Sequence, residues 1–178
     1  MNTLGKFKEI KKKKSSSNIG QLKEFNSKFC FDEIEKVEET STSNKLKIII
    51  SDDCEIIRSS FKKLLLLIKG FKEKYDIVEC GDGIEILKCL MEDQLIGNKI
   101  KAVFTDENME YMNGSKAVTY LKEIEKGGKI HRCNYFSITA FVDEEHKKSI
   151  LNSGFDLIIT KPITKTKIME VFKNYNLL

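Results

Sequence analysis

The sequence predicts a doubly wound α/β fold, in which helices cover both faces of a five-stranded parallel sheet. The main observation is that a short, apolar, β-rich run alternates five times with a longer amphipathic stretch, a pattern typical of βα units. Several amphipathic stretches are also bounded by residues that commonly cap or stop a helix. The expected strands are residues 46–51, 76–80, 102–105, 135–139 and 157–160.

Five helices are expected, one after each strand. In the first, apolar residues recur at three- and four-residue steps between Ile57 and Ile68, and Gly70 is the expected C-terminal stop. Asp143 and Thr164 are the expected N-caps of the fourth and fifth helices. The other bounds are residues 84–91 for the second helix, 115–126 for the third, 143–152 for the fourth, and the residues after Pro162 for the fifth.

The composition is that of a soluble, folded protein. Hydrophobic residues make up 40% of the 178 residues and charged residues 33%, which argues against a disordered chain. The longest apolar run, residues 64–68, is far shorter than the roughly 20 residues of a bilayer span, so no membrane span is expected. The net charge is only +4, with 31 basic and 27 acidic residues, so no direct nucleic-acid contact is expected from charge alone.

The five cysteines are scattered, and none has the CxxC spacing of a metal-ligand set or a redox pair. Their odd number and scatter fit a reducing compartment, so we expect a cytoplasmic protein, with the nucleus as an alternative. The cysteines are Cys30, Cys54, Cys80, Cys89 and Cys133.

The first 44 residues differ in composition from the rest, since they are rich in Lys, Ser, Glu and Asn. We expect residues 1–44 to form a flexible charged arm and residues 45–178 to form the folded domain. The lysine run at residues 11–14 suits an anionic lipid, an acidic partner, nucleic acid or nuclear import, and plain solvation is the simplest interpretation.

Polar side chains stand where four of the five strands end. Asp52 and Asp53 follow the first strand, Asp106 follows the third, Thr139 ends the fourth and Lys161 follows the fifth. Because the carboxyl ends of parallel strands meet at one edge, we expect these side chains to line one crevice. Three converging carboxylates repel one another unless a cation lies between them, and a hard divalent ion with oxygen ligands resolves this. The sequence therefore predicts a Mg²⁺ site.

The same residues suit the transfer of a phosphoryl group to a carboxylate. An aspartyl phosphate needs its oxygens neutralised, and the Lys161 ammonium, the Thr139 hydroxyl and the metal each meet one such need. Asp53 and Asp106 would hold the metal, and Asp52 would bind one of its waters. An Asp-Asp pair taken alone is more often a turn or a helix cap, but the coincidence of carboxylate, hydroxyl and ammonium at one edge favours the functional interpretation.

Other candidate motifs have plainer explanations. Gly81-Asp82-Gly83 invites comparison with a phosphate-binding loop, yet no Gly-Lys-Ser/Thr follows, so a tight strand-to-helix turn is expected there. His131 and His146 lack a Ser or Cys partner at a strand end and are expected to be ordinary surface residues.

Four segments of the chain resemble response-regulator receiver domains, most closely those that end hybrid histidine kinases. The resemblance covers residues 45–178 and implies a flavodoxin-like fold with strand order 2-1-3-4-5 and five helices. The segments are Ile48-Ile49-Ile50-Ser51-Asp52-Asp53, Thr105-Asp106-Glu107-Asn108-Met109-Glu110-Tyr111-Met112-Asn113-Gly114, Ile138-Thr139-Ala140 and Thr160-Lys161-Pro162-Ile163.

The resemblance also implies roles for individual residues. Asp106 is the implied phosphoacceptor, Asp53 a direct Mg²⁺ ligand, Asp52 a ligand mainly through water, and Asn108 a ligand through its backbone carbonyl. A cis peptide is implied before Pro162. Two residues depart from the family pattern: Ile158 stands where a switch aromatic is usual in the fifth strand, and Glu110 replaces the proline that often follows the methionine.

The function expected from these features is that of a phosphoacceptor in a His-Asp phosphorelay. A histidine kinase or a histidine phosphotransfer protein would donate the phosphoryl group, and a conformational change through Thr139 would pass the signal on. Such a chain is not a stand-alone enzyme, although it promotes its own phosphorylation and dephosphorylation. Because the fifth helix ends close to Leu178, we expect output through a protein contact or onward phosphotransfer.

Three alternatives remain at this point. The chain could be a fragment of a hybrid histidine kinase, or a pseudo-receiver that acts as an interaction module without phosphate, which Ile158 favours. It could also be a haloacid-dehalogenase-like phosphatase, but that family places a second Asp two positions after the nucleophile, where this chain has Asn108.

Overall fold

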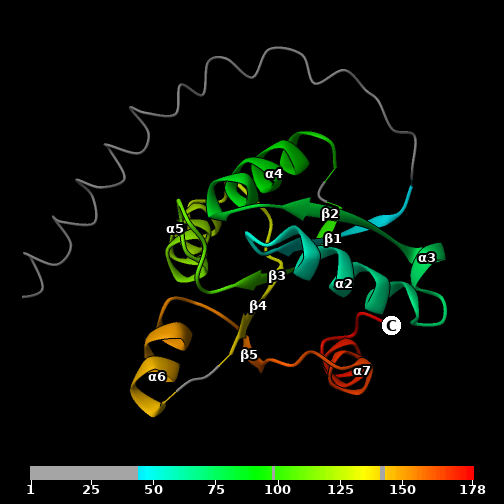
Figure 1. Cartoon of the computed structure of the whole chain (residues 1–178). Helices are drawn as coiled ribbons and strands as arrows, with labels where there is room; N and C mark the ends of the chain where they lie inside the picture. The colour runs from blue at the N-terminus through cyan, green and yellow to red at the C-terminus, as the bar shows by residue number, and fades with distance from the viewer. Residues whose placement is uncertain (1–43, 98, 141–142) are drawn as a thin grey trace, which may run out of the picture. The chain divides into compact units, whose positions relative to one another are not determined.

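The computed structural model describes residues 44–97, 99–140 and 143–178, so the expected arm over residues 1–44 lies outside the described residues except for its last one. Strands and helices alternate along this part of the chain (Figure 1). Within these ranges no helix has the length and apolar character to cross a lipid bilayer. The elements are β1 Leu46–Ser51, α2 Glu55–Leu66, α3 Phe71–Lys74, β2 Tyr75–Cys80, α4 Gly83–Leu95, β3 Ile100–Asp106, α5 Gly114–Lys126, β4 Asn134–Thr139, α6 Glu144–Asn152, β5 Leu157–Thr160 and α7 Lys165–Asn174.

The five strands form one parallel sheet in the order β2-β1-β3-β4-β5, which confirms the predicted fold class and strand order. The predicted strands agree with the structure to within two residues at each end. The register aligns the carboxyl ends of the strands, since Ser51 pairs with both Cys80 and Thr105, and Thr139 pairs with Thr160. The residues that follow the strands therefore share one edge of the sheet.

Several helices start at a residue whose side chain caps them, whereas α2 and α3 have no side-chain cap. The side chains of Asp143 and Thr164 accept hydrogen bonds from the backbone N–H groups of His146 and Lys167, as expected for N-caps. Asp82 caps α4 in the same way, so the Gly81-Asp82-Gly83 segment is the predicted strand-to-helix turn.

One prediction about the helices was wrong, because the described residues contain six helices instead of five. Gly70 does not stop the first helix, which ends at Leu66; it adopts a left-handed conformation (φ 81°) at the start of the short α3. Phe71, the first residue of α3, is buried against Tyr75 and Phe172, so tertiary packing holds this single turn. A four-residue helix has too few residues to produce a helical period in the sequence.

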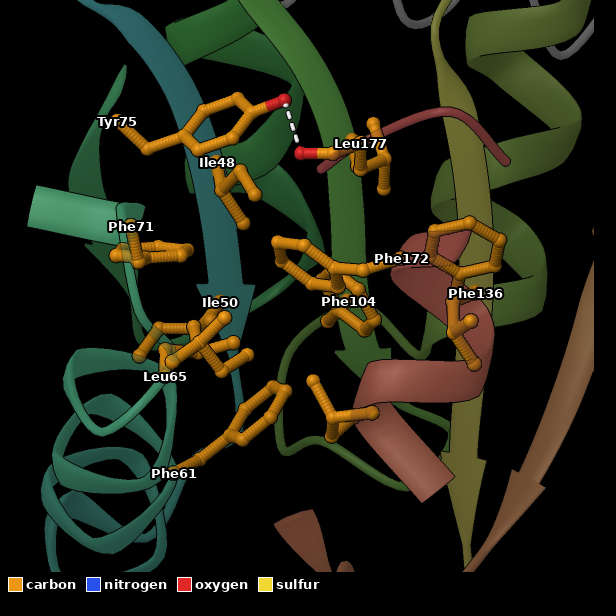
Figure 2. Packing of buried hydrophobic residues seen from close by; sticks show 14 of the residues in the cluster. Ile48, Ile50, Phe61, Leu65, Phe71, Tyr75, Phe104, Phe136, Phe172 and Leu177 are labelled. Atoms are coloured by element: carbon orange, nitrogen blue, oxygen red, sulfur yellow. Dashed lines mark hydrogen bonds between the residues drawn. The ribbon is translucent and has the colours of Figure 1, made fainter. Parts of the chain in front are cut away.

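Aromatic and aliphatic side chains pack together in the core on one face of the sheet. The alternate residues Ile48 and Ile50 of β1 point to this face, where α2 and α7 pack (Figure 2). Phe104 of β3 contacts Phe136 at 4.7 Å and Phe172 at 6.1 Å between ring centroids. Burial of each such side chain contributes about 1.5–3 kcal/mol. The α4 and α5 helices contact each other on the opposite face (Figure 1).

Candidate functional site

Two buried carboxylates share one ammonium group at the carboxyl edge of the sheet. The Lys161 Nζ atom lies 2.7 Å from Asp106 Oδ1 and 3.1 Å from Asp52 Oδ2. Asp52 and Asp106 are 6% and 8% exposed. The structure therefore brings together one residue from the end of each of β1, β3 and β5.

Each carboxylate has one oxygen held by its own loop and the other directed at Lys161. Asp52 Oδ1 accepts a hydrogen bond from the Cys54 backbone N–H at 3.0 Å, at the turn into α2. Asp106 Oδ2 accepts one from the Asn108 N–H at 2.8 Å, at the first turn of the loop after β3. Short side chains that bond to the backbone two residues on are typical of such turns. Each aspartate is thus oriented by a hydrogen bond from the backbone N–H group two residues later in its own loop.

The charge of Lys161 is stabilised despite its partial burial. Desolvation alone would lower the pKa of the ammonium, but hydrogen bonds and Coulombic attraction from Asp106 and Asp52 outweigh it and raise the pKa above its usual 10.5. The backbone also positions this residue, because the Lys161 N–H donates to the Thr139 carbonyl at 2.8 Å. Lys161 therefore stays protonated at the end of β5. The Lys161–Pro162 peptide is cis, as predicted.

The other predicted site residues lie around the cluster of Asp52, Asp106 and Lys161 and form no side-chain ion pair with it. Thr139 is buried at the end of β4, next to Lys161 through the backbone bond described above. Asp53 is exposed, and its carboxylate has no hydrogen bond or ion pair to any other described residue. Asn108 is exposed and contributes its N–H to Asp106. In the described part of the chain, no three Asp, Glu, His or Cys side chains gather closely enough to enclose a metal ion.

A close backbone approach holds the loop after Asp106. The Gly114 N–H donates to the Glu107 carbonyl at 3.1 Å, and a Cβ atom at Gly114 would lie only 2.5 Å from the Asp106 carbonyl oxygen. Because that oxygen belongs to the backbone, a side chain at position 114 would have to push the loop away from β3. Glycine at this position thus keeps the Asp106 loop folded against the start of α5.

The family model for the response regulator receiver domain matches residues 48–173, well over half of the chain. The chain belongs to the response regulator receiver family.

Relatives of this receiver domain occur in both long and short proteins. It is 26% identical over 129 residues to hybrid signal transduction histidine kinase L of Dictyostelium discoideum, covering 72% of this chain but only 7% of the kinase. It is also 26% identical over 129 residues to the chemotaxis protein CheY of Halobacterium salinarum, covering 72% of this chain and 94% of that protein. The chain thus spans a small fraction of one relative and nearly all of the other.

Solved receiver domains share this fold. The receiver domain of a sensor histidine kinase from Pseudomonas aeruginosa, described with a magnesium ion in its active-site cleft, superposes with a TM-score of 0.60 at 15% identity, over 74% of this chain and 97% of that one. The chemotaxis protein CheY4 of Vibrio cholerae superposes with a TM-score of 0.58 at 18% identity, over 74% of this chain and 98% of that one.

The receiver domain differs from the expected pattern at β5. Ile158 lies half-buried there, paired with Ser137 of β4. An aliphatic side chain has no ring to rotate between an inner and an outer position. Any coupling between Thr139 and β5 in this receiver therefore has to use another group.

Three residues near the site were not identified from the sequence. The Arg58 guanidinium donates to the Asp52 carbonyl at 2.6 Å, and the Met109 sulfur accepts a hydrogen bond from the Ser51 hydroxyl at 3.2 Å. Glu107 is only 4% exposed, and desolvation raises its pKa, with partial compensation from Ser115 and His146. Arg58 lies one turn into the helix after the Asp pair, which is a usable signal, whereas nothing in the sequence distinguishes a buried Glu107 from a solvated one.

Proposed function

We propose that this receiver domain accepts a phosphoryl group on Asp106 from a phosphohistidine of a histidine kinase or phosphotransfer protein, with Mg²⁺, and signals through a change of conformation. The observation that carries the proposal is the shared ammonium, because Lys161 bridges two buried carboxylates at 2.7 and 3.1 Å. A structural ion pair needs one carboxylate. A second one in contact with the same cation leaves negative charge for which a further cation is suited.

In the proposed reaction one Asp106 carboxylate oxygen attacks the phosphorus atom. A bond between that oxygen and phosphorus forms, the nitrogen–phosphorus bond of the donor breaks, and the imidazole leaves and retains the electron pair. Lys161, already in contact with Asp106, stabilises the negative charge on the transferred oxygens, and the Thr139 hydroxyl donates to another of them. Water later attacks the same phosphorus, the bond between the Asp106 oxygen and phosphorus breaks, and inorganic phosphate leaves with both protons of the water while the carboxylate is restored. In this way the chain promotes both its own phosphorylation and its dephosphorylation without being a stand-alone enzyme.

The donor set suits Mg²⁺. All candidate ligands are oxygens, and Mg²⁺ commonly uses one or two carboxylates together with waters, so it needs no cage of three acidic side chains. We assign direct ligation to Asp53, Asp106 and the Asn108 carbonyl, with Asp52 acting through a water. The exposed Asp53 carboxylate is available for this role. When bound, the ion supplies positive charge to the phosphoryl oxygens.

A groove beside Lys161 supports docking of the donor protein. Apolar residues of α2 and the residues after β5 line a depression of about 290 Å³ that Lys161 itself borders. Ile56, at the start of α2, is 76% exposed. A contiguous apolar depression bordered by a charged residue is typical of a protein contact. We propose that the histidine-bearing partner contacts Ile56, Pro162 and Ile163 while its phosphohistidine reaches Asp106.

For the output we propose that phosphorylation pulls Thr139 toward the new phosphoryl group and shifts the start of α6, which changes the protein partner bound there. The Lys161 N–H bond to the Thr139 carbonyl links the ends of β4 and β5, so both strands can respond together. We also retain the division into a charged arm over residues 1–44 and a receiver over residues 45–178, acting in the cytoplasm; the family match from residue 48 supports the position of that boundary.

The deciding experiment is to incubate the full chain with acetyl phosphate and Mg²⁺ and to measure its intact mass. We expect one added phosphoryl group of about 80 Da on the wild-type chain and none on Asp106→Asn. A chelator should suppress the adduct, since the ion supports the reaction. An equal adduct on Asp106→Asn, or no adduct on the wild type, would refute the proposal.

A second candidate is a pseudo-receiver that binds a partner without phosphate, and Ile158 in β5 is the observation that favours it. It predicts no acetyl phosphate adduct and weak Mg²⁺ binding, both of which the first proposal contradicts. In either case the chain could be part of a hybrid histidine kinase, as the 7% coverage of the Dictyostelium kinase suggests. A transcript that extends in frame upstream of Met1 would support that arrangement.

A further inference from the structure

Two cysteine sulfurs lie in contact between the edge strand β2 and the helix α4. Cys80 is the last residue of β2, and Cys89 lies in the middle of α4, which covers that strand. Their Sγ atoms are 3.7 Å apart. A disulfide needs a sulfur–sulfur distance of about 2 Å, so side-chain rotation and a small approach of α4 toward β2 would close the remaining gap.

The spacing of the cysteines in the sequence does not reveal this pair, because none of them has the CxxC spacing of a redox pair. The two cysteines are separated by a turn and half of a helix, and they meet because Cys89 lies one helical step beyond the buried Ile86, on the side of α4 that faces the sheet. Among the described residues, no other pair of cysteine sulfurs is in hydrogen-bonding contact.

We propose that Cys80 and Cys89 form a site of reversible disulfide formation, which a low-molecular-weight disulfide such as glutathione disulfide oxidises. The sulfur pair does not include the carboxylates of Asp52 and Asp106, although the Asp52 N–H donates to the Cys80 carbonyl at 3.4 Å. The inference does not depend on the proposed phosphotransfer. Its basis is the contact between two sulfurs of unequal exposure, one buried and one half-buried.

The two cysteines have different roles in the reaction. Cys80 is 1% exposed, whereas Cys89 is half-buried and therefore accessible to a small disulfide. The hydrogen bond between the sulfurs lowers the pKa of Cys89, with help from Lys88 and against desolvation, while the same bond and burial raise the pKa of Cys80. Cys89 is thus the attacking thiol and Cys80 the resolving thiol.

The exchange balances in two steps. The Cys89 thiolate attacks one sulfur of glutathione disulfide, that sulfur–sulfur bond breaks, and one glutathione leaves as a thiolate that takes up a proton from water. The Cys80 thiol then loses its proton and attacks the Cys89 sulfur of the mixed disulfide, which releases the second glutathione. Two protein thiols are oxidised and one glutathione disulfide is reduced to two glutathione molecules.

Peptide mapping tests the proposal directly. The folded full chain is treated with glutathione disulfide, remaining thiols are blocked with N-ethylmaleimide, and the chain is digested with trypsin without reduction. Because Lys88 directly precedes Cys89, trypsin places the cysteines in different peptides, residues 75–88 and residues 89–99. We expect these two peptides joined by a disulfide, as one species about 2 Da lighter than their sum, which separates after reduction.

Variants distinguish the two roles. Cys80→Ser should stop the reaction at a mixed disulfide, with one glutathione on Cys89, whereas Cys89→Ser should leave Cys80 free to be blocked only after unfolding. Cys133→Ser is the control, and the 75–88 to 89–99 link should persist in it.

The same treatment in denaturant measures how the cysteines react when the fold no longer holds the Cys80 and Cys89 sulfurs together. There the link should be diluted among pairings with Cys30, Cys54 and Cys133, because the folded contact is lost. Recovery of the 75–88 and 89–99 peptides without a link from the folded wild type, or a glutathione that stays on Cys89 without transfer, would overturn the proposal. The wild-type result is sufficient if a variant fails to fold.

Discussion

Polar side chains have different kinds of partner at the two edges of the sheet. At the amino edge, where the strands begin, the Tyr75 hydroxyl donates to the Leu177 carbonyl at 2.8 Å (Figure 2). Asp93 accepts from the Ile100 N–H at 2.8 Å and lies 3.7 Å from the Lys47 ammonium, so here one carboxylate faces one ammonium. At the carboxyl edge, Asp52 and Asp106 compete for the single ammonium of Lys161.

This difference suggests that one edge of the sheet contributes mainly to stability and the other mainly to function. A hydroxyl bonded to a neutral carbonyl contributes about 1 kcal/mol, and a carboxylate that faces one ammonium is balanced in charge. Two carboxylates that share one cation are strained by mutual repulsion, which added positive charge would relieve. The amino edge should therefore control unfolding and the carboxyl edge phosphotransfer, and substitutions at each edge test this separation.

The largest effect is expected from Phe172→Ala, next to the amino edge. Phe172 is fully buried and packs near Phe71, Tyr75 and Phe104, so its loss leaves a cavity among aromatic rings. We expect the free energy of unfolding, measured in urea, to fall by about 3–5 kcal/mol. Leu95→Ala is the control, because Leu95 is 65% exposed, and it should change stability little. A loss of phosphorylation in the still-folded fraction of Phe172→Ala would contradict the separation of the edges.

The next largest effect is expected from Lys161→Met at the carboxyl edge. The substitution removes the charge that contacts Asp106 but leaves both carboxylates in place. We expect the rate of phosphorylation by acetyl phosphate to fall about 10²-fold. Mg²⁺ affinity, measured by calorimetry, should stay the same or increase, because the ammonium no longer competes for the carboxylates. Lys165→Met makes the same charge change at an exposed position and should leave the rate unchanged; equal loss in both variants would mean that overall charge alone matters.

The sheet was largely predictable because its signal is local. Runs such as the Ile48-Ile49-Ile50 triplet are buried on both faces in a parallel sheet, and the end of each run marks the end of a strand. The N-caps Asp143 and Thr164 were predictable for the same reason, since capping is decided within four residues. The α3 helix was missed because its stability comes from Phe71 packing on Phe172, a residue about 100 positions away.

The candidate site was predictable only as a set of residues at one edge. The sequence placed Asp52, Asp106 and Lys161 at strand ends, and parallel pairing brought them together. It did not tell which of the two adjacent aspartates points inward; in the structure Asp52 is buried and Asp53 exposed. The contact between Cys80 and Cys89 was equally hidden, since it depends on how α4 lies on β2.

A smaller effect is expected from Tyr75→Phe at the amino edge. The ring stays packed against Phe71 and Phe172, but the Leu177 carbonyl loses its donor. We expect the free energy of unfolding to fall by about 1 kcal/mol, with phosphorylation unaffected. Tyr111→Phe, at a residue that is 73% exposed, should change neither quantity. A slower phosphorylation in Tyr75→Phe would show that the two edges are coupled through the sheet.

The smallest effect concerns Glu107, a carboxylate at the carboxyl edge that is buried and forms no ion pair with Lys161. Burial raises its pKa above the usual 4.5, so the folded state favours the protonated form. The protonated Glu107 carboxyl therefore makes its full contribution to the free energy of unfolding below pH 4.5. That contribution is lost as the pH rises through the raised pKa of the folded state. Glu107→Gln removes this ionisation. Relative to wild type, we expect the free energy of unfolding of the variant to increase as the pH rises from acidic to neutral, because the variant has no carboxylate to ionise at this buried position.

Urea unfolding of both proteins at an acidic and at a neutral pH measures that gain as a difference, so the other carboxylates cancel. Glu110→Gln removes a carboxylate from an exposed position of the same loop and reports what loss of a charge does by itself. If the stability difference between Glu107→Gln and wild type is the same at both pH values, burial of Glu107 carries no penalty. The ionic strain at this edge would then be confined to Asp52, Asp106 and Lys161, where a phosphoryl group and a metal ion are proposed to act.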